Sequence, residues 1–205
     1  MTATSRDGWN HNTHYHDRLL RAVPRPCRRA LDVGCGVGQF ARVLAGVANT
    51  VDALDADAAV IRDARARSTD APNVRFVHAD FMTWTADEPY DFVSLVASLH
   101  HLPFAAALTK SAELLRPGGV LVVLGLDRAR SIFHAAARSL PAYPVSRYYR
   151  LRRGEAPVGA PIQEPTMTLG EIREQAAAVL SGAVVQRHLL WRYSLEWTKP
   201  PSRRS

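Results

Sequence analysis

Three glycines at alternate positions and an acidic residue just before them are the residues best suited to ligand chemistry. Gly34, Gly36 and Gly38 follow a short apolar run, and Asp32 lies two positions before the first glycine. Glycine permits a sharp turn and lets a ligand approach the backbone closely. A carboxylate beside this turn repels a pyrophosphate and favours a ligand that carries positive charge. The dinucleotide fingerprint also requires a glycine where this chain has Gln39, so the pattern disfavours NAD.

Further acidic residues follow the next two predicted strands and could hydrogen-bond a nucleoside. Asp55 comes about 20 residues after the first glycine, where a doubly wound fold places a carboxylate on the ribose hydroxyls. Both hydroxyls are donors, and one carboxylate can accept from both. Asp57 could compete for this role, but it is better interpreted as the N-cap of a following helix. Asp80 follows the third predicted strand and could cap the turn after it.

Histidines occur at two places where they could take part in acid–base chemistry. His100 and His101 follow the fourth predicted strand, and ligands of open α/β sheets lie outside the carboxyl ends of the strands. With an ordinary pKa near 6.5, either could take a proton from a hydroxyl nucleophile. Each could equally orient a loop or contact the ligand. His14 and His16 lack a cysteine or carboxylate partner of known type, so we expect no metal site.

The spacing of apolar residues predicts the elements that must position these side chains. Short apolar or alternating runs predict strands, and a period of 3.6 residues predicts helices. The predicted strands cover residues 31–33, 50–54, 74–77, 91–97, 120–124, 184–190 and 191–197. The predicted helices cover residues 9–23, 40–47, 58–67, 105–115, 131–140 and 168–180. A strand, a glycine turn and a helix in that order form the nucleotide-binding corner of a doubly wound α/β sheet.

The glycine turn carries a resemblance to a known family. Leu31-Asp32-Val33-Gly34-Cys35-Gly36-Val37-Gly38 resembles the first motif of the class I S-adenosylmethionine (SAM)-dependent methyltransferases, in particular the small single-domain members of the methyltransferase-domain 11/25 type. The predicted helix, the turn at residues 116–119 and the strand after it resemble another hallmark of that family. The resemblance implies a Rossmann-like, doubly wound α/β sheet of seven strands in three α/β/α layers. The sheet is then mostly parallel, with an antiparallel last strand.

The resemblance also implies a cofactor and a set of residues that contact it. The cofactor is SAM, whose sulfonium and ammonium suit Asp32, and the product is S-adenosylhomocysteine (SAH). In the family, an acid at the position of Asp80 accepts from the adenine amino group, and the next backbone amide meets a ring nitrogen. The expected cofactor-binding residues are Asp32, Gly34, Cys35, Gly36, Gly38, Asp55, Ala56, Asp80, Phe81 and Ala97. The expected substrate or lid residues are His14, Tyr15, His16 and Tyr148.

We expect one domain preceded by a lid. Residues 1–28 form the N-terminal lid helix, and residues 29–198 form the methyltransferase domain. The irregular segment 127–167 is expected to cover the acceptor, because such loops carry specificity, and residues 199–205 form a disordered tail. The lid histidines are expected to share a pocket with His100 and His101. Removal of residues 1–16 is expected to abolish turnover while the sheet still folds.

Charge and composition leave three functions open. The chain has 205 residues and a net charge of +7, and residues 128–153 hold seven arginines and no acid. We favour O- or N-methylation of a small molecule, because the chain lacks an Asn/Asp-Pro-Pro-Tyr stretch and an RNA-binding appendage. One alternative is a protein or nucleic-acid substrate that docks on the arginine-rich segment. The other is a protein of this fold that transfers no methyl group.

The sequence contains neither a recognisable targeting signal nor a cysteine pattern that indicates a function. No apolar run reaches the length of a membrane span, and residues 1–17 lack the apolar core of a signal peptide. We therefore expect no membrane partner and a cytoplasmic location. Cys27 and Cys35 are expected to be free thiols, and the oligomeric state is left open.

Overall fold

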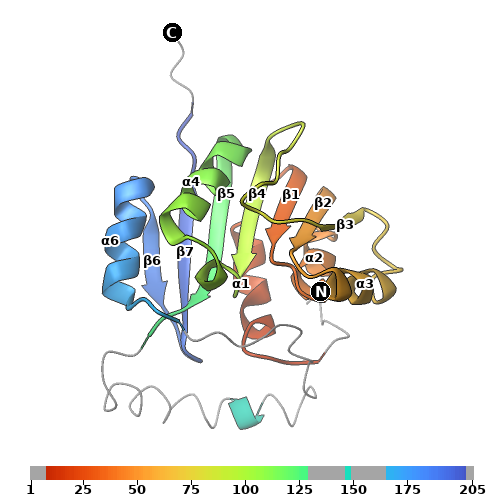
Figure 1. Cartoon of the computed structure of the whole chain (residues 1–205), viewed down its shortest axis with the longest axis horizontal. Coiled ribbons are helices and arrows are strands. Elements are labelled where there is room, and N and C mark those ends of the chain that lie inside the picture. Colours follow the sequence, from red (N-terminus) through yellow and green to blue (C-terminus); the bar gives the residue numbers. More distant parts are fainter. Residues whose placement is uncertain (1–7, 129–145, 149–164, 202–205) are drawn as a thin grey trace.

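One mixed sheet forms the centre of the molecule (Figure 1). The computed structural model describes residues 8–128, 146–148 and 165–201. Within them, seven strands have the order β3-β2-β1-β4-β5-β7-β6. The first five strands run parallel, and β7 is antiparallel to both of its neighbours. The strands are β1 Cys27–Val33, β2 Ala48–Asp55, β3 Val74–His78, β4 Tyr90–Val96, β5 Leu115–Leu126, β6 Val184–Arg187 and β7 Arg192–Thr198. This topology confirms the predicted fold.

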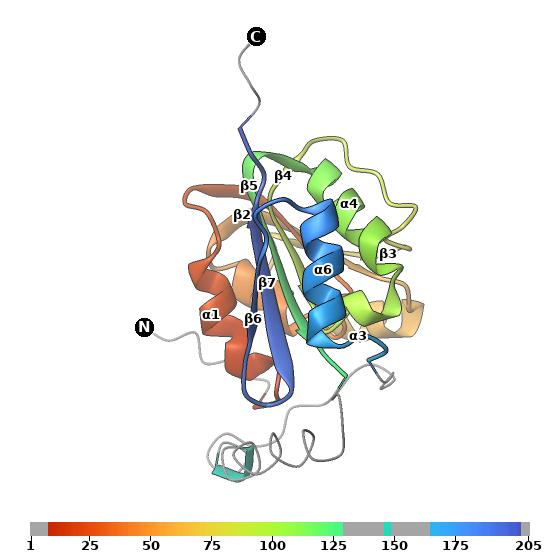
Figure 2. The same cartoon turned by 90° about the vertical axis from the view of Figure 1, so that its left-hand side faces the viewer.

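Helices cover both faces of the sheet. The helices are η1 Thr13–Tyr15, α1 His16–Arg21, α2 Gln39–Leu44, α3 Ala58–Ala66, η2 Leu99–His101, α4 Phe104–Leu114 and α6 Leu169–Val179. Figure 2 shows α1 on one side of the sheet and α4 with α6 on the other. None of the helices in the described part of the chain is long and apolar enough to span a bilayer. The helix predicted over 131–140 lies outside the described residues.

Alternating side chains of the strands fill two separate cores. In β5, Val122 and Leu124 belong to the core that includes α2 and α3, whereas Leu121 and Val123 belong to the core that includes α4 and α6. Helices cover both faces of this sheet, which explains the continuous apolar run at residues 120–124 of β5. Trp9 is only 1% exposed and belongs to the first core.

Several predicted boundaries were wrong. The last two strands do not meet at residue 190, because β6 ends at Arg187 and β7 begins at Arg192. Leu190 and Trp191 have φ values of 57° and 58°, and this left-handed backbone makes the reversal. The turn at residues 116–119 is a bulge inside β5, since the pairing with β4 jumps from Leu115 to Val120. The helix after the glycine turn ends at residue 44 rather than 47.

The structure confirms the two predicted helix caps and the free thiols. Asp57 accepts hydrogen bonds from the backbone N–H of Ala59 and Val60 at 2.7 and 3.3 Å, which confirms it as the N-cap of α3. Thr168 forms the predicted capping box at the start of α6. Both cysteines are free and buried, and burial raises the pKa of Cys27 to about 11.

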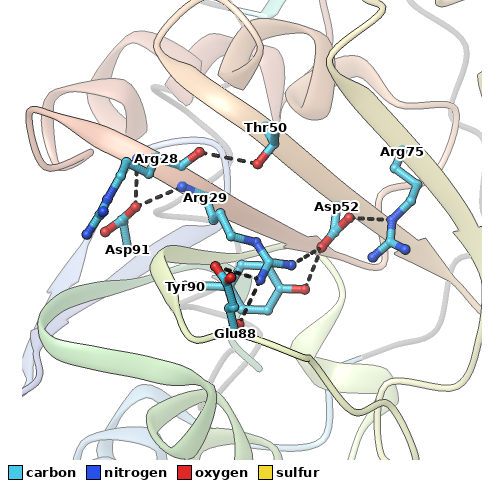
Figure 3. A network of polar contacts seen from close by, with 8 residues as sticks. All are labelled: Arg28, Arg29, Thr50, Asp52, Arg75, Glu88, Tyr90 and Asp91. Atoms are coloured by element: carbon cyan, nitrogen blue, oxygen red, sulfur yellow. Dashed lines mark hydrogen bonds and ion pairs between the residues drawn. The ribbon is translucent and has the colours of Figure 1, made fainter.

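A buried carboxylate on β2 binds side chains near the amino ends of β1, β3 and β4 (Figure 3). Asp52 accepts from Arg75 Nε at 2.7 Å, from the Tyr90 hydroxyl at 2.7 Å and from Arg29 Nη2 at 3.2 Å. Burial opposes ionisation of Asp52, but the hydrogen bonds from Arg75 and Tyr90 outweigh it and lower its pKa. The network is therefore structural, and it lies away from the carboxyl ends of the strands.

Asp52→Ala is expected to lower the free energy of unfolding by about 2 kcal/mol, because it leaves the buried Tyr90 hydroxyl without an acceptor. The matched control is Glu88→Ala, which removes an ion pair of 3.8 Å to Arg29 from a side chain that is 75% exposed. That change is expected to cost at most about 0.5 kcal/mol. Urea unfolding at pH 7 measures both, and equal effects would contradict a structural role specific to Asp52.

Candidate functional site

The glycine turn between β1 and α2 has one open position and two closed ones. All three glycines have positive φ, at 67°, 54° and 79° for Gly34, Gly36 and Gly38. A Cβ on Gly34 would lie 2.4 Å from the Cβ of Ser98, and one on Gly38 would lie 2.6 Å from the ring of Phe76. A Cβ on Gly36 would meet no atom of the described residues within 4 Å. The backbone at Gly36 therefore faces the space that a ligand can use.

Asp32 presents a buried carboxylate oxygen that lacks a partner. The residue is 1% exposed, and Oδ1 accepts from the Ser94 hydroxyl at 2.8 Å. Oδ2 has no hydrogen-bond partner among the described residues. The pKa of Asp32 is raised to about 7, mainly by burial and also by the charge of Asp55, while the hydrogen bond from Ser94 opposes the rise. A cationic ligand group would stabilise the ionised form, so this residue fits the ammonium or sulfonium of SAM.

Asp55, at the end of β2, is fixed against the glycine turn. Its Oδ2 accepts from the N–H of Gly36 at 2.9 Å, and its Oδ1 accepts from the N–H of Asp57 at 3.0 Å. A carboxylate has about four acceptor sites, so two are left for ribose hydroxyls. Asp57 itself is occupied as a helix cap, and this arrangement separates the roles of the two acids.

Other predicted cofactor residues follow β2 and β3, and each of them has a contact within the protein. Asp80 is exposed, and its Oδ1 accepts from the N–H of Met82 at 2.8 Å, so it caps the turn as the alternative interpretation expects. The Phe81 side chain is buried in the core below α4 and α6, so its backbone is the part available to a ligand. The carbonyl oxygen of Ala56 lies 3.1 Å from His78 Nε2.

The loop after β4 is strained and tied down. Ala97 has a φ of 55°, and its N–H donates to Leu124 O at 2.7 Å. The hydroxyl of Ser98 donates to Val33 O at 2.6 Å. Non-glycine residues adopt this conformation at a cost of about 1–3 kcal/mol and cluster at functional sites. The strained loop carries the two histidines to the carboxyl edge of the sheet.

The two histidines differ in environment. Their ring centroids are 4.1 Å apart, and His101 is exposed whereas His100 is half-buried. His100 Nδ1 is buried and has no hydrogen-bond partner in the described part of the chain. Burial, together with the charges of His101 and Arg192, lowers the pKa of His100 to about 4. His100 is therefore neutral at pH 7 and a weak proton acceptor.

The N-terminal segment crosses the carboxyl edge of the sheet. Asn10 Nδ2 donates to Gln39 Oε1 at 3.1 Å on α2, and the Tyr15 hydroxyl donates to Leu189 O at 2.8 Å before β7. Trp9 and Tyr15 belong to the hydrophobic core, so removing residues 1–16 would also remove core side chains. The expectation that the sheet folds without residues 1–16 stays a prediction, and it must hold despite the loss of these two core side chains.

The predicted lid residues have different surroundings. The His16 ring is buried and lies 5.0 Å from the ring of Phe40 in α2. His14 contacts the ring of Tyr15 edge-on at 4.9 Å. Tyr148 is 53% exposed, and most of the segment around it lies outside the described residues. The link between the N-terminal segment and His100 is Arg192, a residue that sequence reasoning did not single out.

Arg192 is the first residue of β7, and it interacts with the N-terminal segment and with the loop after β4. Its guanidinium donates to Asn12 Oδ1, and its charge acts on both Tyr15 and His100. The alternation of Tyr193 and Leu195 places Arg192 on the opposite face of β7. Nothing in the local pattern indicates that this face is covered, so only the burial seen in the structure identifies the residue.

Comparisons with known proteins agree with this geometry. A family model described as a methyltransferase domain matches residues 30–119. An uncharacterized methyltransferase of Mycobacterium tuberculosis is 36% identical over 200 residues, which cover 94% of this chain and 98% of the relative. A ubiquinone biosynthesis O-methyltransferase of Xylella fastidiosa is 31% identical over 124 residues, which cover 58% of this chain and 50% of that protein.

Solved structures share the fold. The N-methyltransferase NodS from Bradyrhizobium japonicum WM9, in complex with SAH, superimposes with a TM-score of 0.62 at 17% identity. The match covers 93% of this chain and 89% of NodS. Because the identity to the relative from M. tuberculosis extends over nearly the full length of both proteins, and the sheet has the predicted order, the chain belongs to the class I SAM-dependent methyltransferases.

Proposed function

We propose that the protein transfers a methyl group from SAM to an oxygen or nitrogen of a small-molecule acceptor at the carboxyl edge of its sheet. The observation that carries the proposal is the unpartnered, buried oxygen of Asp32 beside the open position at Gly36. The names of two relatives support the acceptor class: the ubiquinone biosynthesis O-methyltransferase and a trans-aconitate 2-methyltransferase of Rhizobium rhizogenes, 37% identical over 110 residues.

The residues of the chain would contribute mainly by binding and orientation. SAM supplies an activated methyl group, whose transfer turns the charged sulfonium into a neutral thioether. Asp32 would balance the positive charge of the cofactor, and Asp55 would hold the ribose. Fixing nucleophile and methyl in line can contribute up to roughly 7–11 kcal/mol to the rate. A neutral amine or a carboxylate needs no base before attack, whereas a hydroxyl would use His101, which lies exposed at the edge.

The test combines binding and turnover. Calorimetry is expected to show binding of SAM and SAH in the micromolar range and none for NAD. Incubation with methyl-labelled SAM and a panel of small acids, amines and alcohols is expected to yield a labelled product and an equal amount of SAH. Tight NAD binding without SAM binding would overturn the assignment of the site. Salt-dependent RNA or DNA binding with methylation of that polymer would favour the alternative substrate class.

SAM affinity is expected to rise about tenfold between pH 5.5 and pH 7, because binding a cation requires Asp32 to lose its proton. The folded-state pKa of about 7 lies above the ordinary value of 3.8, so ionisation destabilises the free protein as the pH rises through this window. A bound cation reverses that preference, so about one proton is released on binding at pH 5.5 and about half a proton at pH 7. Calorimetry in buffers of different ionisation enthalpy measures the release.

The matched control for this pH effect is Asp32→Asn, which keeps an oxygen acceptor for the Ser94 hydroxyl but cannot titrate. Its SAM affinity is expected to be weaker than that of the wild type at pH 7 and nearly independent of pH. A wild-type affinity that does not change over this range would show that Asp32 does not respond to the charge of the cofactor.

A further inference from the structure

A buried guanidinium lies at the same edge of the sheet as the glycine turn. Arg192 pairs with Leu126, the last residue of β5, so it lies at the carboxyl end of the parallel strands. Arg192 is only 7% exposed. Burial lowers its pKa to about 10, and the residue is therefore still charged at neutral pH. A buried cation is costly unless something compensates its charge.

The partners of Arg192 are all neutral. Nε and Nη2 donate to Asn12 Oδ1 at 3.0 and 2.8 Å, and Nη1 donates to Leu190 O at 3.3 Å. The ion pairs found among the described residues do not include Arg192. These contacts orient the guanidinium without neutralising it.

The backbone around Arg192 is strained and held from several sides. Leu190 and Trp191 are consecutive non-glycine residues with left-handed backbone. The turn is fixed by the bond from the Tyr15 hydroxyl to Leu189 O and by the bond from His188 N–H to Arg192 O at 2.8 Å. Figure 2 shows α1 beside the β6–β7 hairpin, and Arg18 of α1 donates to Gln186 of β6 at 2.7 Å. Strain of this kind persists where the surrounding structure determines it, and it marks binding sites.

The hydrogen-bond count of the guanidinium indicates what it can bind. A guanidinium has five N–H donors, and three of them are used. One N–H is left on each terminal nitrogen, and two such donors match the two oxygens of a carboxylate. A single cation balances the single charge of a carboxylate but not the double charge of a phosphate monoester. His100, which interacts electrostatically with Arg192, is neutral and adds no further positive charge.

We propose that Arg192 binds a carboxylate of the methyl acceptor, so that the acceptors of this enzyme are carboxylic acids. This inference rests on the proposed methyl transfer at the same edge of the sheet. The two remaining N–H groups of Arg192 hold the acid, Asn12 holds the guanidinium, and the buried position excludes water. The carboxylate then supplies the counter-charge that the described residues lack.

The test compares acids with their amides on the whole protein, free and saturated with SAH. The probes are acetate, hexanoate and benzoate, their primary amides, and phenyl phosphate, measured by calorimetry at pH 7. At least one carboxylate is expected to bind tenfold or more tightly than its amide and than phenyl phosphate. Arg192→Gln is expected to abolish this preference. Arg18→Gln, which removes a cation with a carboxylate partner 3.3 Å away, is expected to keep it.

A second variant distinguishes loss of the carboxylate site from loss of the fold. Asn12→Asp places a carboxylate against the guanidinium and supplies the counter-charge from within the chain. It is expected to remove the preference for acids while the thermal unfolding temperature stays the same or rises. Acids and amides that bind equally to the wild type, or a preference that survives in both variants, would overturn the proposal. Tighter binding of phenyl phosphate would assign the site to phosphate instead.

The two proposals fail in different ways. A protein that binds SAH and methylates neutral acceptors without any preference for acids would remove only the inference about Arg192. Failure to bind SAM or SAH would remove the proposed function. The acid preference can still be measured on the free protein in that case.

Discussion

Gly34→Ala is expected to lower the free energy of unfolding by about 2–5 kcal/mol. The left-handed backbone contributes about 1–2 kcal/mol for any residue with a Cβ, and overpacking contributes about 1–3 kcal/mol. The added methyl would lie 2.4 Å from Ser98 Cβ. Ser98 cannot move away easily, because its hydroxyl donates to Val33 O at 2.6 Å. Urea unfolding of the variant measures the change.

Gly36→Ala is the matched control, and it separates packing from binding. Its φ of 54° imposes the same backbone cost of about 1–2 kcal/mol, but the part of the chain that the structure describes has no atom within 4 Å of the added methyl. The methyl would instead occupy space proposed for SAM, so the affinity is expected to fall at least tenfold. A folded Gly36→Ala protein with wild-type SAM affinity would show that the turn does not hold the cofactor. Equal stability of the two variants would contradict the packing argument.

The central part of the fold could be predicted from the sequence because two independent signals coincide there. The apolar runs of β1, β2 and β4 show that the strands are buried, and the glycines show where the chain must turn. The sequence also predicted that Asp57, and not Asp55, is the helix cap, because an acid just before a helix pattern is a typical N-cap. The hydrogen bonds of Asp57 confirm that part of the assignment.

The hairpin between β6 and β7 could not be predicted in the same way. Its reversal uses Leu190 and Trp191 in left-handed backbone, although neither residue type favours that conformation. Tertiary contacts impose it, such as the bond from the Tyr15 hydroxyl to Leu189 O, which joins positions 174 residues apart. The apolar residues at 189–191 therefore looked like the place where two adjoining strands meet.

The role of Arg192 depends on contacts that are equally remote in sequence. Asn12 lies 180 residues away from it, and the N-terminal segment must fold over β7 before the guanidinium becomes buried. An arginine at the start of a strand is ordinarily a surface residue, so its type alone carries no signal. Trp9 is a similar case, because its polar surroundings in the sequence conceal a core side chain.

Asp55→Ala is expected to weaken SAM binding by about 1.5–3 kcal/mol, or roughly 10- to 150-fold, which is the scale for hydrogen bonds to a charged group. The carboxylate accepts from the N–H of Gly36 at 2.9 Å, so its removal also frees the backbone of the glycine turn. Asp57→Ala is the matched control two residues away. It removes an N-cap and is expected to lower the free energy of unfolding by about 1 kcal/mol with little change in affinity.

Calorimetry with SAM and urea unfolding, carried out on both variants, distinguish the two acids. Asp55→Asn adds a finer comparison, because an amide oxygen can still accept one bond while the negative charge is lost. We expect its affinity to lie between those of the wild type and Asp55→Ala. If Asp57→Ala lost affinity while Asp55→Ala bound SAM normally, the ribose would have to lie two residues further along the chain. The contact between Asp55 and Gly36 would then serve only to shape the turn.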